Sequence, residues 1–378
     1  MNLLLALALF TGWATSTVSS PFSPNALHDS TRQAFFEGWF FRIADHEHQV
    51  SVVLIFASYR EAGAKRKGLK HYVSLGLSRK SNGNGAREVI KTFHAFRDDK
   101  DGGPIDRPTS KNDRTSSPEF TWAAQGIGSV TVSGDEGYLQ MALPELSIFA
   151  KFSGRVPWST KRPNGAGPEG WLGATDLLPL RYFIHSFASD ANYTVTPSGE
   201  PPMMGRGSMH LETNYGRAFF PKGWVWAQGV DTTTECESGV KFVMTGGKFL
   251  IGPLTTNSFL IGYRSALHTW DFRNTDLDRI QASWSVSDGQ MEVIARSPMG
   301  GRVLEARLYS AERSFGDQFY VPGDNGWTNQ PGAMESHNVT AKFRLYKRKA
   351  PYLSRQLVEE AEVTMAVLEF GGEFINPQ

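Results

Sequence analysis

ASWSVSDGQMEVIA, residues 282–295, alternates apolar and polar side chains on both sides of Asp288-Gly289. A period of two places the apolar side chains on one face of a β-strand. Asp-Gly between two such runs is a strong hairpin signal, because both central residues of a type I′ turn need a positive φ. The stretch therefore predicts a β-hairpin with one buried face.

Similar patterns occur elsewhere in the chain. Residues 130–142 alternate in the same way around Gly134-Asp135-Glu136-Gly137, so they resemble 283–295 and indicate two similar β units. A further half-buried strand is predicted before Gly371-Gly372, where one face carries Ala361, Val363, Met365 and Val367 and the other carries Glu362, Thr364, Ala366 and Leu368. Helical signals are few; residues 353–360 predict one or two helical turns.

The composition is that of a globular, all-β chain. Of 378 residues, 40% are hydrophobic, 20% are charged, and 39 Lys and Arg balance 38 Asp and Glu. This balance excludes a basic field for nucleic acid. The length fits about two domains, and the breaker-rich stretch 197–208 is the best linker. We therefore expect domains at 21–200 and 201–378.

The N-terminus has the pattern of a secretory signal at residues 1–20. The apolar run Leu3–Ala14 is followed by the small, polar stretch Thr15–Ser20. The run is shorter than the about 20 residues that a membrane span needs. We expect entry into the secretory pathway, or alternatively a plastid reached through the endomembrane system.

Metal and cofactor signals are weak. Cys236 is the single cysteine, which excludes an intramolecular disulfide and a site built from several Cys ligands. His46-Glu47-His48 has the spacing of two metal ligands, but its polar surroundings favour a turn at a strand end. The chain carries no phosphate-binding loop and no dinucleotide-binding glycine pattern. We expect neither a metal nor a cofactor.

Two aromatic clusters each surround one glutamate. The first is FFEGWFFR at 35–42, around Glu37; the second runs from HLETNYG at 210–216 to FFPKGWVWAQ at 219–228, after Glu212. By composition alone, such carboxylates are more typical of structural ion pairs in a β core.

These clusters resemble motifs of the tocopherol cyclase family. FFEGWFFR is similar to that family's opening motif, and ETNYGRAFFPKGWVWAQ (212–228) resembles its E-K-N-W-G…F-P-x-x-W-x-W-x-Q signature. MAVLEFGG at 365–372 resembles the family's S-x-A-A-V-E-I-G-G. The chain departs from the family at Thr213, where the family has Lys, and at Tyr215, where it has Trp.

The resemblance implies two tandem lipocalin-like β-barrel or sandwich domains with few short helices and an apolar pocket. It implies a cofactor-independent enzyme that closes a prenylated hydroquinone to a chromanol. The partner would be an apolar prenylated small molecule, and peripheral association with a membrane or lipid body would fit such a substrate. Related carotenoid-hydratase-like and fungal pericyclase proteins also act on long apolar molecules.

Roles follow from this chemistry. A carboxylic acid kept protonated by burial can protonate the alkene, which makes Glu37 and Glu212 the candidate acids. His185 would relay the proton, although a core histidine is the simpler reading. The candidate substrate-binding residues provide aromatic faces for the cation or hydrogen bonds to the phenol oxygens: Phe36, Trp39, Tyr215, Trp224 and Trp226 for the faces, and Asn214 and Gln228 for the hydrogen bonds.

Two other functions fit the same residues. One is a pericyclase or hydratase acting on another prenyl or polyketide substrate. The other is a non-enzymatic carrier of an apolar ligand. A carrier predicts that Glu37 and Glu212 form ion pairs with residues such as Arg42 or Arg217, whereas an acid would face the pocket without such a cation.

Overall fold

The computed structural model describes residues 35–375 except for 61–68, 81–86, 99–101, 106–118, 161–166, 176–177, 179, 217–219, 232–238, 252–253, 312–313, 324–325 and 349–352. The predicted signal segment, Cys236 and Arg217 therefore lie outside the described residues. In the described part, no helix is long and apolar enough to cross a membrane. The helices described there are three short 3-10 turns: η3 (Gly170–Ala174), η4 (Asn274–Asp276) and η5 (Pro298–Gly300).

The first sheet is antiparallel and nearly closed. Its strands are β1 (Phe35–Asp45), β2 (Val50–Arg60), β3 (Leu69–Lys80), β4 (Arg87–Asp98), β5 (Gly102–Ile105), β6 (Glu119–Ala124), β7 (Gly128–Ser133), β8 (Glu136–Ala142), β9 (Leu146–Ser153), β10 (Leu180–Pro197) and β11 (Met203–Gly216). Their spatial order is β4-β3-β2-β1-β11-β10-β9-β8-β7-β6-β5. The first strand thus pairs with the last.

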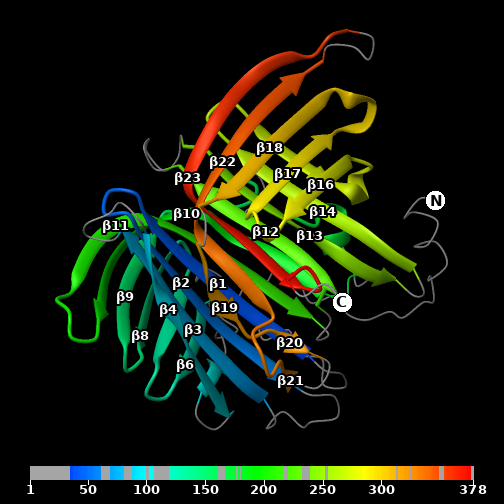
Figure 1. Ribbon diagram of the computed structural model, residues 1–378. Helices are drawn as coiled ribbons and strands as arrows, with labels where there is room; N and C mark the ends of the chain where they lie inside the picture. Colours follow the sequence, from blue (N-terminus) through cyan, green and yellow to red (C-terminus); the bar gives the residue numbers. More distant parts are fainter. Residues whose placement is uncertain are drawn as a thin grey trace, which may run out of the picture.

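The second sheet repeats this arrangement. Its strands are β12 (Gly223–Val230), β13 (Lys241–Ile251), β14 (Leu254–Arg264), β15 (Thr269–Arg273), β16 (Arg279–Ser285), β17 (Gln290–Arg296), β18 (Arg302–Ser310), β19 (Phe315–Phe319), β22 (Ala333–Lys347) and β23 (Gln356–Gly372). The order is β15-β14-β13-β12-β23-β22-β18-β17-β16, and β19 pairs with β22. The small hairpin β20 (Pro322–Gly323) and β21 (Gly326–Trp327) lies apart. Figure 1 shows the sheets as two groups of strands.

The two halves are therefore tandem lipocalin-like β domains, as predicted. The hairpins at 130–142 and 282–295 are β7–β8 and β16–β17, and they occupy equivalent places in the two sheets. The chain passes to the second sheet between Gly216 and Gly223. The expected boundary at 200/201 falls instead between β10 and β11, which pair within the first sheet.

The turn predicted for the second hairpin is wrong in detail. Ser285 pairs with Gln290, so four residues, 286–289, connect the strands. Of these, Gly289 alone has a positive φ, +60°, whereas a type I′ turn needs two such residues.

The interior of each barrel is filled by side chains. Alternate residues of β1, including Trp39, Phe41 and Ile43, pack inside the first barrel with Trp122 and Leu211. In the second barrel, Val225 and Ala227 of β12 pack with alternate residues of the neighbouring strands. The opposite faces of β1, β11, β12 and β23 are thus left to meet between the barrels.

The strand β23 reverses its faces at a bulge. Met365 has a φ of +52°, and the β22–β23 register shifts between Val339 and Ala341. Val363 packs inside the barrel before the bulge, and Ala366 and Leu368 do so after it. The predicted alternation is therefore wrong beyond Val363, because an extra residue at a bulge inverts the pattern.

The helical turns predicted at 353–360 are also wrong. Residues from Gln356 onward belong to β23, and Glu360 lies opposite Arg344 of β22. Arg344 Nε donates a hydrogen bond to Glu360 Oε1 at 2.7 Å. Pairing with a neighbouring strand overrides the local helical tendency.

Each domain extends one connection over the other. The first arm, residues 154–179 between β9 and β10, reaches the second domain, where Trp158 Nε1 donates to Asp271 Oδ2 at 3.1 Å and Arg264 Nη2 donates to Trp158 O at 2.8 Å. The equivalent second arm, residues 311–332 between β18 and β22, carries β19–β21.

The second arm lies on the outer face of the first sheet. The Tyr59 hydroxyl donates to Gly323 O at 3.1 Å, and the ring of Trp327 lies 4.9 Å from that of Tyr72. Each arm thus packs on the other domain, and residues of both arms line the cavity between the sheets.

Candidate active site

A cavity of about 260 Å³ lies between the two sheets. Ligand pockets commonly occur at domain interfaces and are mostly apolar. The outer faces of β1, β2, β11, β12 and β23 and both arms form its wall, which includes Phe36, Phe40, Ile55, Leu172, Phe220, Phe319, Val321 and Trp327. Such a wall suits an apolar ligand.

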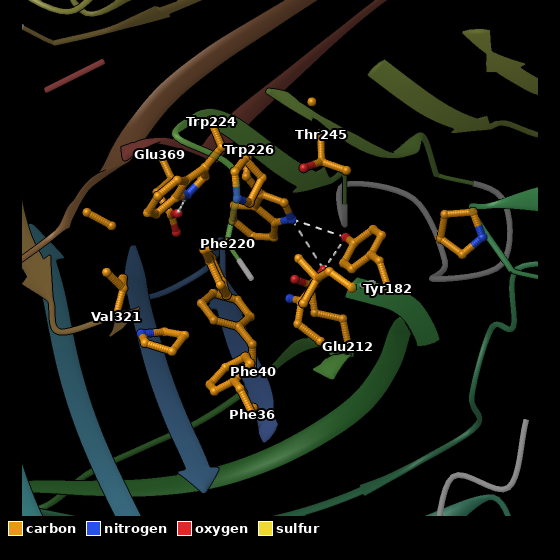
Figure 2. Close-up of a pocket in the computed structure, with 18 of the residues that line it drawn as sticks. Phe36, Phe40, Tyr182, Glu212, Phe220, Trp224, Trp226, Thr245, Val321 and Glu369 are labelled. Carbon is orange, nitrogen blue, oxygen red and sulfur yellow. Dashed lines mark hydrogen bonds between the residues drawn. The ribbon is translucent and has the colours of Figure 1, made fainter. Parts of the chain in front are cut away.

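Two tryptophans of β12 each hold a different carboxyl group at this wall (Figure 2). Trp224 Nε1 donates to Glu369 Oε1. Trp226 Nε1 donates to Glu212 Oε2 at 3.3 Å and to the Tyr182 hydroxyl at 3.1 Å. Residues two apart on a strand lie about 7 Å apart on the same face. The two carboxyl groups therefore flank one stretch of cavity.

Glu212 accepts several hydrogen bonds at one oxygen. The Tyr182 hydroxyl donates to Oε2 at 2.5 Å, and His210 Nε2 lies 2.8 Å from the same atom. With Trp226, three polar side chains meet at this oxygen. Burial and the nearby Glu212 raise the pKa of Tyr182 well above its ordinary value, so Tyr182 keeps its proton and remains a donor. Within the described part of the chain, no Arg or Lys forms an ion pair with Glu212.

Glu369 stands beside a second glutamate. Glu335 of β22 lies directly opposite Glu369 in the register and is fully buried. Burial and the facing Glu335 raise the pKa of Glu369 well above its ordinary value. Glu369 lines the cavity, and its burial beside Glu335 favours the neutral form of its carboxyl group.

Glu169 adds a third carboxyl group to the wall. The backbone N–H of Tyr182 donates to Glu169 Oε1 at 2.7 Å. Burial raises the pKa of Glu169 to about 8, although this hydrogen bond and Arg181 oppose the rise. The first arm thus brings a largely neutral carboxylic acid to the cavity.

Six of the predicted site residues come together at this wall. They are Phe36, Trp39, Glu212, Asn214, Trp224 and Trp226. Trp39 also packs in the first barrel, where its ring stacks on His185 at 4.8 Å.

The other four predicted site residues lie away from the described wall. Glu37 and Tyr215 face each other across β1 and β11, on the side of the strands that carries Trp39. His185 Nε2 lies 3.0 Å from Thr213 Oγ1 on that same side. The register thus groups these side chains behind the wall that carries Glu212.

Gln228, the fourth, joins the two domains. Arg42 Nη1 donates to Gln228 Oε1 at 2.8 Å, and Arg42 Nη2 donates to the carbonyl oxygen of Met365. Arg42 and Gln228 are buried. This contact fixes β1 of the first domain against β12 and β23 of the second.

The sequence reasoning missed three polar residues of the wall: Tyr182, Glu169 and Glu369. Glu369 had a usable signal, since it is the one charged residue within the apolar MAVLEFGG segment. Tyr182 and Glu169 had none. Tyr182 lies in a stretch of ambiguous pattern, and Glu169 in a Pro/Gly-rich loop.

The His46-Glu47-His48 segment forms the turn between β1 and β2. His46 Nε2 contacts Val230 O at 3.0 Å, and His48 Nδ1 contacts Asp45 Oδ2 at 2.8 Å. The two rings thus have separate protein partners. Among the described residues, no group of three or more His, Cys, Asp or Glu has a metal-binding arrangement.

Comparison with known proteins places this fold. Residues 33–372 match the model of a family described as tocopherol cyclase-like. Curated proteins give no match. A protein described as an AttH from Nitrosomonas europaea has 11% identity over 95% of this chain and 98% of its own, with a TM-score of 0.51. CghA has 8% identity over 94% of this chain and 95% of its own, with a TM-score of 0.52. The structure of CghA with Sch210972 has 9% identity over 93% of this chain and 95% of its own, with a TM-score of 0.50. At these identities the likeness shows the fold alone.

Proposed function

Because the chain belongs to the tocopherol cyclase-like family, we propose that its cavity binds a prenylated hydroquinone and closes it to a chromanol without a cofactor. The observation that carries this proposal is the position of Glu212. It is a buried carboxyl on a largely apolar wall, and no Arg or Lys among the described residues pairs with it.

Ring closure needs an acid and a base. The acid protonates the trisubstituted alkene on the carbon that leaves a tertiary cation. The phenol oxygen then forms the C–O bond, and its proton passes to the base. Substrate and product are isomers, so no oxidant or reductant is consumed. A carboxyl group near the alkene and another near the phenol would serve both steps.

The aromatic wall suits the cation. Phe36, Phe40 and Trp226 line the cavity, and the ring of Phe220 lies edge-on to that of Trp224 at 5.0 Å. A desolvated ring face stabilises a cation by roughly 1–2 kcal/mol. An apolar wall also offers water few hydrogen-bond partners, which disfavours capture of the cation as an alcohol.

Confinement of the substrate in the cavity also favours ring closure. The cavity volume is near the lower end of the range for ligand pockets, roughly 300–1,000 Å³. A ring and the adjoining part of the prenyl chain would fill it, and holding the phenol oxygen against the alkene removes much of the entropic barrier.

The test is incubation of the purified full chain with a panel of prenylated hydroquinones in D2O, with no cofactor added. We expect a single chromanol enantiomer that carries one deuterium on the carbon between the benzylic carbon and the new quaternary centre. A hydrated product would indicate a hydratase. Tight retention of the hydroquinone without any product would indicate a carrier, and either result would overturn the cyclase proposal.

A further inference from the structure

Each half of the molecule places a carboxyl group on the equivalent strand, β11 in the first sheet and β23 in the second. In the first sheet, Glu212 on the last strand lies opposite Phe40 on the first strand. In the second sheet, Glu369 on the last strand lies opposite Trp226 on the first. Both side chains reach the same cavity, so the fold repeat presents it with a pair of acids.

The surroundings of the two carboxyl groups differ. Tyr182 and Trp226 donate hydrogen bonds to Glu212 Oε2, and His210 Nε2 lies 2.8 Å from the same atom. Glu369 has one indole donor, from Trp224, and a second carboxyl group opposite it. Donors stabilise a carboxylate, whereas a buried neighbour of like charge opposes ionisation.

Glu335 lacks the donors that a buried carboxylate needs. Both of its oxygens are buried, and within the described residues neither accepts a hydrogen bond, apart from a 3.2 Å contact of Oε2 with His337 Nε2. A proton on Glu369 supplies that missing donor. Two ionised carboxylates in this position would repel each other without solvent to screen them, which favours one proton held between the two groups.

We propose that Glu369, which shares a proton with Glu335, is the acid that protonates the alkene, and that Glu212 is the base that accepts the phenol proton. This assignment rests on the proposed function. The Glu369 O–H bond breaks as the new C–H bond forms from the alkene electrons, and the phenol O–H bond breaks as its oxygen bonds to the cation. Solvent exchange after product release restores both groups.

Glu335 is a positioning residue in this scheme, since it acts through Glu369. The titratable groups that face the pair are Glu212 of β11, His337 of β22 and Tyr72 of β3. Removing the charge of Glu335 lowers the pKa of Glu369, because the facing carboxylate is one of the causes that raise it. A merely structural role would not predict a change in that direction.

The activity test compares Glu369→Gln and Glu335→Gln with a matched control, Glu359→Gln. Glu359 also lies on β23 and accepts hydrogen bonds from Tyr263 and His268, at 2.8 and 2.7 Å, but outside the cavity. We expect Glu369→Gln to lower kcat by about 10²–10⁴-fold, with the control near wild type. In Glu335→Gln, the alkaline limb of the kcat/KM profile should move about one unit or more to lower pH.

An infrared measurement tests the shared proton without turnover. The wild-type spectrum minus that of the double variant Glu335→Gln/Glu369→Gln should show a carboxylic acid stretch, and the wild-type spectrum minus that of Glu359→Gln should not. Glu169 is present in all three proteins, so its contribution cancels. If the wild type is active while Glu369→Gln retains its activity, the assignment fails and the cyclase proposal stands. If no hydroquinone reacts, the cyclase proposal fails, and a missing infrared band would overturn the shared proton independently.

Discussion

Glu37 and Glu212 lie on opposite faces of the paired strands β1 and β11. Glu37 is opposite Tyr215, and Glu212 is opposite Phe40. Because partners directly across an antiparallel pair share a face and neighbours along a strand alternate, only Glu212 of the two reaches the cavity. The two glutamates of the aromatic motifs therefore do not face the same cavity.

This relationship predicts that replacing Glu212 by glutamine affects turnover more than replacing Glu37 by glutamine. Glu212→Gln should lower turnover by about 10²–10⁴-fold, since it removes a proton acceptor at the cavity, and should leave hydroquinone binding largely intact. Glu37→Gln should retain most of the turnover. The measurements are kcat and quenching of tryptophan fluorescence by the substrate. Equal losses of kcat in both variants would contradict the structural assignment.

Tyr182 should matter to catalysis through Glu212. Tyr182→Phe removes the hydroxyl that donates to Glu212 at 2.5 Å and accepts from Trp226 at 3.1 Å. We expect kcat to fall by about tenfold or more, and stability to fall by about 1–3 kcal/mol from the lost buried hydrogen bonds. Tyr263→Phe is the matched control, because Tyr263 donates to Glu359 at 2.8 Å in the second barrel. A similar fall of kcat in both variants would argue against a role at the site.

Arg42 should stabilise the contact between the domains. Arg42→Met leaves Gln228 Oε1 and Met365 O without their buried donor, and we expect a loss of about 2–4 kcal/mol. The loss is measured as the difference in the free energy of unfolding by urea between the wild type and the variant. Arg344→Met is the control, since Arg344 forms an exposed pair with Glu360 and exposed pairs contribute about 0–1 kcal/mol. Equal effects of the two substitutions would contradict the buried contact.

Glu169 should make stability depend on pH. Its pKa is about 8 in the folded protein against an ordinary value of 4.5, so the folded chain holds a proton that the unfolded chain has lost. Stability therefore falls as pH rises from about 4.5 to about 8, by roughly 5 kcal/mol at most, and then stays level.

Glu169→Gln removes this dependence and keeps an oxygen for the Tyr182 N–H. The free energy of unfolding of both proteins can be measured with urea at about pH 5 and about pH 9. Relative to the wild type, the variant should be more stable at the higher pH than at the lower one. A difference between wild type and variant that is the same at both values would show that Glu169 ionises normally.

The barrel strands were predictable from the sequence because alternation is a local property. A strand with one buried face repeats every two residues, whatever lies across from it, so the hairpins at 130–142 and 282–295 and their relation could be predicted. The aromatic motifs indicated Glu212, Trp224 and Trp226 as site residues through their resemblance to the family's signature, whereas composition alone favoured structural ion pairs.

Register and bulges are not local, and they decided the rest. The predicted face of β23 reverses at Met365, which turns Glu369 to the cavity. The register of β1 and β11 turns Glu37 away from it. Glu169 and Tyr182 reach the wall only because the first arm and β10 fold back toward the second domain. Local sequence patterns indicated two alternating β units and two aromatic motifs with one glutamate each. Which carboxyl groups face the ligand was decided by strand pairing, since shifting a strand by one residue moves every side chain to the other face.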